Sequence, residues 1–396
     1  MDICTKRVWS KMTSDDKIEA TERDVQILQE LPDHLAMECL ARVPLDNLHG
    51  VSKTWEDVIY DPYFQRLRAA NGSTQLDWIY ALVQMQDKSF KWRALDPHSS
   101  RWHDLPPPPH DMEFQLFNPG CIGVSYTVQC VSTSSKLVMI AGVKARKDGQ
   151  PRMTVEPALD HPYIFDTRTS LWKRGSPFKV PRKWCVCGVV DEKVYVASGS
   201  GKDWSQELSK SAEVYNLEND KWEALQNLST SKFSGEAMNA VSNNNKLYFV
   251  SGRGVFSKEG VVYDIITQSW SEMSPGLKQG WKGPCVAVNG KFYLIETPAG
   301  KLKVYAPERD EWDIIMVDSR LANLEVLIGT KGKIVAIEAA SLKDDETNPG
   351  VLRVIDIASD APQILDIPVQ EGQVVCVQVL AMMNQPSKLE RGQSYF

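Results

Sequence analysis

The chain has 396 residues, of which 42% are hydrophobic and 24% are charged, and these proportions suit a folded globular protein. They exclude a collagen, a long coiled coil and a disordered chain. The formal net charge of −6 gives no overall attraction to nucleic acid or to an anionic membrane, so we expect neither as a partner. The longest apolar stretch, near residues 137–143, is much shorter than the roughly 20 residues of a membrane-spanning helix.

The N-terminal residues and the cysteines indicate a reducing compartment. Residues 1–24 mix Lys, Arg, Asp and Glu without an apolar core, unlike a secretory signal. The eight cysteines are dispersed and form no CxxC pair. We therefore expect reduced thiols, in a protein of the cytoplasm, the nucleus or both.

A small helical module is predicted near the N-terminus, between residues 31 and 68. Leu31 and Pro32 open its first helix, apolar residues then recur at helical spacing, and Pro44 ends the helix. Residues 51–59 carry the apolar face of another helix. A module of about 40 residues cannot bury enough surface to be stable alone. Its apolar face must therefore be covered either by the rest of the chain, as a helical cap, or by a partner protein.

One spacing recurs through the remainder of the chain: an aromatic or apolar residue ends a strand, and Trp follows seven residues later. The pairs are Leu95 and Trp102, Phe165 and Trp172, Tyr215 and Trp222, Tyr263 and Trp270, and Tyr305 and Trp312. A sixth copy, around Ile355, has Pro362 in place of Trp. We expect the five tryptophans to pack between neighbouring repeats.

A second pattern precedes each pair and completes a unit of four short strands. Lys opens a strand of alternating apolar residues, as in 136–142, 193–199 and 246–252, and another strand with a tight turn lies before it. Six such units predict a six-bladed β-propeller. The first unit lacks its first strand, and we expect Gln373–Met382 to supply it and to close the ring.

These units resemble kelch repeats, and the N-terminal module, with LPxxLxxxxLxxVP followed by VSKxW, resembles an F-box. The chain as a whole is similar to plant F-box/kelch-repeat proteins of the Skp-interacting-partner class, most closely at LPDHLA, QCVS, KWCVCG and GWKGP. The resemblance implies an all-β six-bladed kelch β-propeller with a small N-terminal α-helical F-box module. It divides the chain into a flexible tail at 1–27, the F-box at 28–72, the propeller at 73–383 and a C-terminal tail at 384–396.

The resemblance also implies a role as a non-catalytic, substrate-recognition subunit of a Skp/cullin/F-box ubiquitin ligase. The F-box would bind a Skp-type adaptor, and through it a cullin, while the propeller would hold the protein to be ubiquitinated. The expected adaptor-binding residues are Leu31, Pro32, Leu35, Leu40, Val43, Pro44, Val51 and Trp55.

The alternative is a propeller enzyme, or a small-molecule sensor that uses the central channel. No histidine follows His161, so four of the six units offer no imidazole for a metal or a catalytic triad. Cys185 and Cys187 alternate along a predicted strand, as buried small residues would. The stretch at 198–202 lacks the spacing of a phosphate-binding loop. We therefore expect no catalytic residue, metal or cofactor.

The target is expected on the face of the propeller that carries the long loops, because binding residues concentrate on loops held by a rigid scaffold. These loops contain many basic and aromatic residues, which favours a target with an acidic patch. The expected target-binding residues are Arg182, Lys183, Trp184, Trp204, Arg253, Trp281 and Lys282. The alternative for the loop tryptophans is burial against neighbouring blades.

Overall fold

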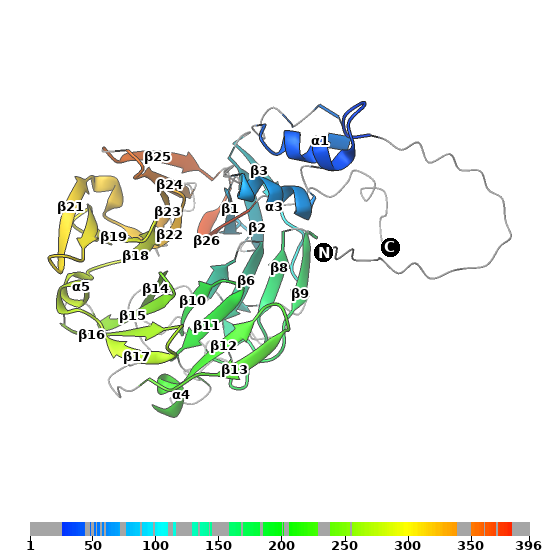
Figure 1. Cartoon of the computed structure of the whole chain (residues 1–396). Helices are drawn as coiled ribbons and strands as arrows, with labels where there is room; N and C mark the ends of the chain where they lie inside the picture. Colours follow the sequence, from blue (N-terminus) through cyan, green and yellow to red (C-terminus); the bar gives the residue numbers. More distant parts are fainter. Residues whose placement is uncertain are drawn as a thin grey trace, which may run out of the picture. The chain divides into compact units, whose positions relative to one another are not determined.

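The computed structural model of the chain contains two compact units, Met1–Thr74 and Gln75–Phe396 (Figure 1). The described residues are 26–43, 48, 51–52, 54–55, 58, 61–71, 77–87, 89–97, 100–109, 114–115, 129–133, 135–141, 143–144, 158–167, 169–182, 185–199, 201, 206–228, 238–253, 256–338, 350–359, 361–369 and 371–381. Apart from residues 26 and 27, the two predicted tails lie outside them. No helix within the described ranges is long and apolar enough to cross a membrane.

The first unit contains α1 (Asp33–Leu40) and α3 (Pro62–Ala70), and residues 54, 55 and 58 are helical as well. Asp61 opens α3, because its Oδ1 accepts the backbone N–H groups of Tyr63 and Phe64 at 2.6 and 3.2 Å. Pro62 follows at the first helical position, where its missing N–H costs nothing. The sequence Asp-Pro therefore starts this helix.

Arg68 joins α3 to the end of α1. Its Nη1 donates to the carbonyl oxygens of Ala41 and Val43, at 3.3 and 2.6 Å, and the residue is 4% exposed. The last carbonyl groups of a helix have no partner within the helix and attract a cation. Burial lowers the pKa of the guanidinium. The contact therefore fixes the packing of the two helices.

The second unit is a ring of six four-stranded antiparallel sheets, which we number as blades in chain order (Figure 1). Blade 1 contains β26 (Gln373–Ala381), β1 (Asp77–Gln84), β2 (Phe90–Asp96) and β3 (Arg101–Asp104); blade 2 contains β5 (Gln129–Ser132), β6 (Lys136–Ala141), β8 (Tyr163–Asp166) and β9 (Leu171–Arg174); blade 3 contains β10 (Val186–Val190), β11 (Lys193–Ala197), β12 (Ala212–Asn216) and β13 (Lys221–Ala224). Blade 4 contains β14 (Met238–Asn243), β15 (Lys246–Arg253), β16 (Phe256–Asp264) and β17 (Ser269–Glu272); blade 5 contains β18 (Cys285–Val288), β19 (Lys291–Glu296), β20 (Lys301–Ala306) and β21 (Glu311–Val317); blade 6 contains β22 (Leu324–Thr330), β23 (Lys333–Glu338), β24 (Val351–Asp356) and β25 (Gln363–Pro368).

The first strand named in each blade is the innermost, since β26, β5, β10, β14, β18 and β22 contact one another in turn around the ring. The short helices α4 (Gln206–Lys210), α5 (Pro275–Gly280) and η2 (Ser319–Leu321) and the two-stranded pair β4 (Phe114–Gln115) and β7 (Val143–Lys144) lie in the connections. The predicted six-bladed propeller is confirmed.

The C-terminal strand closes the ring, as predicted. β26 pairs antiparallel with β1, with Tyr80 opposite Gln378 and Asp77 opposite Ala381. Blade 1 is thus built from both ends of the unit, so the first and last blades cannot separate without breaking a sheet. The strand ends at Ala381, and Met382 lies outside the described residues.

The repeated tryptophans pack between blades, also as predicted, and they add a hydrogen bond that the spacing does not reveal. Each lies opposite its aromatic or apolar partner in the outer hairpin; Tyr215, for example, pairs with Trp222. Trp172, Trp222, Trp270 and Trp312 donate from Nε1 to the backbone oxygens of Pro106, Ser176, Gln226 and Leu277, each in the chain segment that follows the preceding blade. In blade 6, Ile355 instead pairs with Ile364, because the hairpin is longer.

Six apolar clusters make up the core, and each fills the space between two neighbouring sheets. The spacing of seven follows from the outer turn. The residue just before each outer strand adopts positive φ in the first five blades, for example Asp220 at 57° and Asp310 at 55°. Asp220 and Asp310 also accept the hydroxyl groups of Tyr215 and Tyr305, which locks the turn onto the strand.

Candidate functional site

The predicted adaptor-binding residues divide into an exposed and a buried set. Pro32 precedes α1 and is exposed, Leu35 is 45% exposed, and Val51 is 54% exposed. Single exposed apolar residues are common on protein surfaces, and these three are accessible to a partner protein. We call Pro32, Leu35 and Val51 the exposed apolar set.

Leu40 corrects the prediction. It is only 4% exposed, so it packs inside the unit and offers little surface to a partner. Leu31 and Val43 are half-buried. Trp55 is also half-buried, and its Nε1 donates to the backbone oxygen of Ile27 at 2.9 Å. This hydrogen bond connects the helical residues around Trp55 to the start of the first unit. Pro44 lies outside the described residues.

The propeller has two distinct faces, which follow from the order of its strands. Turns between first and second strands, and between third and fourth strands, are short and share one face; the other connections share the opposite face, which we call the long-loop face. The chain enters the propeller at Asp77, at the short-turn end of β1, where Thr330 from the end of β22 donates to its carboxylate. Asp77, where the described part of the propeller begins, therefore lies on the face opposite the long loops.

Arg182, a predicted target-binding residue, is a structural residue. It is 1% exposed; its Nη1 donates to the backbone oxygen of Ser198 and to Oγ of Ser211, each at 3.0 Å, and its Nη2 lies 2.6 Å from Oε1 of Glu213. A buried charge has to be paired in this way to be tolerated. The prediction is therefore wrong for Arg182, which ties its own loop to β12.

Trp281 is also buried, at 2% exposure, in the cluster between blades 4 and 5 with Leu277, Cys285 and Phe292. It directly follows α5, whose Leu277 packs in the same cluster. The alternative stated for the loop tryptophans is therefore correct at this position. Lys183, Trp184 and Trp204 lie outside the described residues, and Arg253 ends β15.

Lys282 is a predicted target-binding residue that the structure places on the surface. Its side chain is 52% exposed and its Nζ lies 4.0 Å from Oε1 of Glu296. Lys303 donates to the same carboxylate, and this contact, with Lys282 and Lys301 nearby, lowers the pKa of Glu296. Three lysines around one carboxylate leave a local excess of positive charge on the long-loop face of blade 5.

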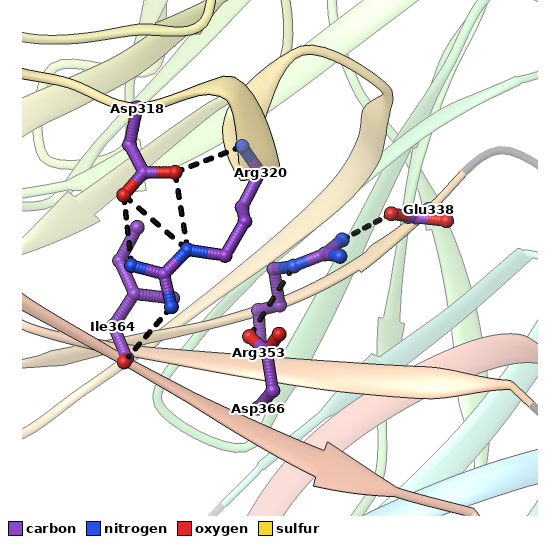
Figure 2. Close-up of polar contacts among 6 residues, drawn as sticks. All are labelled: Asp318, Arg320, Glu338, Arg353, Ile364 and Asp366. Atoms are coloured by element: carbon purple, nitrogen blue, oxygen red, sulfur yellow. Dashed lines mark hydrogen bonds and ion pairs between the residues drawn. The ribbon is translucent and has the colours of Figure 1, made fainter.

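Sequence reasoning missed a second charged group, on the long-loop face at blade 6 (Figure 2). Arg353 lies between Glu338 and Asp366 and is 8% exposed, whereas the two acidic side chains are 46% and 41% exposed. Arg353 stands two residues before Ile355, at the position that Glu213 holds before Tyr215 and Lys303 before Tyr305. An alignment of the repeats could therefore have shown that a charged residue recurs two positions before the residue that ends the third strand.

Arg320 and Asp318 lie beside this group (Figure 2). The guanidinium donates to both carboxylate oxygens, with Nη2 2.8 Å from Oδ2, and its Nη1 reaches the backbone oxygen of Ile364 at 3.4 Å. The hydrogen bonds from Arg320 lower the pKa of Asp318 to about 2. The long-loop face of blades 5 and 6 therefore carries both signs of charge, a pattern suited to protein contacts.

Four of the described thiols are poor nucleophiles. Burial raises the pKa of Cys130, Cys187 and Cys285, and it raises that of Cys185 to about 11. A thiol whose pKa is raised holds little of the reactive thiolate at neutral pH. Within the described residues, no group of three His, Cys, Asp or Glu side chains is arranged to hold a metal ion.

Comparison with known proteins agrees with this geometry. The family described as Kelch motif matches residues 181–229, which include all four strands of blade 3. The chain is 29% identical over 385 residues to F-box/kelch-repeat protein SKIP25 of Arabidopsis thaliana, covering 91% of each chain. F-box/kelch-repeat protein SKIP4 of the same plant is 23% identical, over 88% of this chain and 93% of its own.

Among solved structures, the one titled "Structure of YjhT" covers 69% of this chain and 91% of its own, at 11% identity and a TM-score of 0.49. The fold assignment itself depends on the sheet order given above. That sheet order defines a six-bladed kelch propeller protein. The predicted resemblance to plant F-box/kelch-repeat proteins is also confirmed.

Proposed function

We propose that this protein is the substrate-recognition subunit of a Skp/cullin/F-box ubiquitin ligase, acting in the cytoplasm, the nucleus or both. The observation that supports it most is the division into two units, a small helical one with exposed apolar residues and a closed propeller. The names of the two plant relatives SKIP25 and At1g22040 contain both F-box and kelch repeat, and they support the same role.

In this role the protein works by tethering. The helical unit binds a Skp-type adaptor, and the propeller holds the target, so the target's lysines stay near the ligase's reactive end at a high effective concentration. The chain itself needs no nucleophile, which fits the raised pKa of its buried thiols.

The exposed apolar set is the proposed docking surface for the adaptor. Buried aromatic and aliphatic anchors carry most of the binding energy in protein interfaces. Replacing Pro32 and Leu35 together by Ala removes two such anchors at the start of α1. We expect adaptor binding to weaken at least tenfold, about 1.4 kcal/mol, with unchanged unfolding of the propeller.

The test is co-purification of the adaptor with the full chain, read by mass spectrometry. Tyr63→Ala is the matched control, because Tyr63 is 49% exposed on α3, outside the proposed surface. Adaptor binding that survives Pro32→Ala with Leu35→Ala, or that is lost equally in Tyr63→Ala, would contradict the assignment of this surface.

A further inference from the structure

The outer edge of each blade is a place where another strand could add. An outer strand has one neighbour only, and its free backbone groups can pair with an extended segment from another protein. Four of the outer strands, β3, β9, β13 and β17, are only four residues long and expose mostly charged or polar side chains. Short, charged edges of this kind resist pairing. The two longer edges, β25 and β21, differ from each other.

The edge of β25 is guarded. Arg320 donates to the backbone oxygen of Ile364 within this strand, and Asp318 holds the guanidinium in place from the other side (Figure 2). The strand ends at Pro368, which has no N–H to offer. A cation fixed on the main chain and a terminal proline both discourage an added strand.

The edge of β21 is long and unguarded by comparison. It runs for seven residues, contains neither Lys nor Pro, and is the last strand of its sheet in the part of the chain that the structure describes. The helix α5 contacts its beginning, where Trp312 donates to the backbone oxygen of Leu277 and Asp310 accepts from the N–H of Gly276. The segment Asp313–Val317 continues beyond these contacts.

A β-bulge gives this segment two chemically different faces. Lys303 pairs with Ile314 and Lys301 with Val317, so the extra residue of the bulge brings Ile314 and Val317 to the same side of the sheet. They are 51% and 66% exposed. The other side carries Glu311 and Asp313, whose side chains are 71% and 49% exposed. On the edge strand itself, one face therefore presents Ile314 and Val317, with Lys303 and Lys301 of β20 beside them. The other face presents Glu311 and Asp313 together with the half-buried Met316.

The charges around the segment decide between possible occupants. Glu308, Glu311 and Asp313 all pair with one cation, Arg309, so the acidic face keeps a net negative charge. The positive charges of Lys301 and Lys303 lie on the other face, and Lys303 is paired with Glu296. A second copy of the chain pairing through the same edge would bring two acidic faces together, which is unfavourable. A segment that alternates apolar and basic residues would instead match both faces at once.

We propose that Asp313–Val317 of β21 binds an extended segment of a partner protein in which apolar and basic residues alternate, and that this segment adds as a fifth strand to blade 5. The backbone groups would supply affinity, while Ile314, Val317 and Asp313 select the side chains. Naming this partner the ubiquitination target depends on the proposed function; the binding itself does not.

The test uses the full chain and two fluorescein-labelled eight-residue peptides, one alternating valine with lysine and the other valine with glutamate. Fluorescence polarisation should show the lysine peptide binding at least tenfold more tightly. Val317→Lys should weaken that binding at least tenfold, and Asp313→Asn should reduce its dependence on salt. Leu171→Lys is the matched control, since Leu171 is 65% exposed on the short outer strand β9, and it should leave binding unchanged.

Thermal unfolding of each variant separates loss of binding from loss of folding. If Val317→Lys does not fold, Ile314→Thr replaces it as the test variant, because threonine is also a strand-forming residue. Equal affinity for the two peptides, or full affinity in folded Val317→Lys or Ile314→Thr, would overturn the proposal. So would a dimer in sedimentation that Val317→Lys abolishes, because the edge would then bind a second copy. The peptide-binding experiment contains no adaptor, so a failure of the peptide to bind leaves the adaptor-binding proposal unaffected.

Discussion

Arg182 and Glu213 form an ion pair inside blade 3 in which both side chains are almost completely buried, 1% and 8% exposed. Removing one partner of such a pair leaves an uncompensated buried charge and costs about 3–5 kcal/mol, whereas replacing both by apolar residues is often neutral. We therefore expect Arg182→Met to lower the free energy of unfolding by about 3 kcal/mol or more. The double variant with Glu213→Leu should recover most of that loss.

Urea denaturation of the purified chain measures both values. Lys282→Met is the control at the same scale, because its exposed charge should change the stability by no more than about 0.5 kcal/mol. If Arg182→Met were as stable as Lys282→Met, Arg182 would not be the structural residue described here, and its place among the target-binding residues would reopen.

At the level of elements, β26 decides whether the ring is closed. It supplies the innermost strand of blade 1 and packs beside β5 and β22 of the neighbouring blades. A chain that ends before Gln373 would leave the edge of β1 bare and open the contact between blades 1 and 6. We expect such a chain to aggregate or to lose cooperative unfolding.

Circular dichroism during thermal unfolding, together with size-exclusion chromatography, tests this. A chain that lacks only residues 384–396, a polar stretch, should match the full chain. A soluble, cooperatively unfolding chain without β26 would show that the blade 1 pairing contributes little to stability.

The elements could be predicted largely from the sequence because the repeat encodes them. A turn residue at positive φ fixes the distance from Tyr215 to Trp222, so the spacing of seven reports an actual hairpin. The exposure of single loop residues could not be predicted, because contacts with residues distant in the sequence determine it. Arg182 and Trp281 both lie in loops of the predicted target-binding face. Arg182 is buried against Glu213, a residue much later in the sequence, and Trp281 is buried in the cluster between blades 4 and 5.

The same limit applies to the first unit. Leu35 and Leu40 both fit the apolar pattern of one helix, and only the packing of α1 against α3 determines that Leu35 is exposed while Leu40 is buried. A helix with apolar residues on two sides does not reveal which side a partner covers. The Asp318 and Arg320 pair escaped notice for a different reason: neighbouring opposite charges are common in turns.

At the scale of the whole molecule, the two units should be separable in function. All strands of the closed ring, including the pairing of β1 with β26, lie within Gln75–Phe396. A unit as small as Met1–Thr74 buries too little surface to add much to the propeller's own stability. We therefore expect a chain limited to residues 75–396 to keep the unfolding transition of the propeller within a few degrees, to retain binding of the valine–lysine peptide, and to lose the adaptor.

Differential scanning calorimetry, fluorescence polarisation and adaptor co-purification measure these three properties on the same samples. The full chain with Pro32→Ala and Leu35→Ala is the matched control, since it should reproduce the loss of the adaptor without removing any residue. If the shortened chain failed to fold, the helical unit would have to be a cap on the propeller, because its apolar side chains would then be needed within the chain. If it folded and still bound the adaptor, the docking surface would lie on the propeller instead.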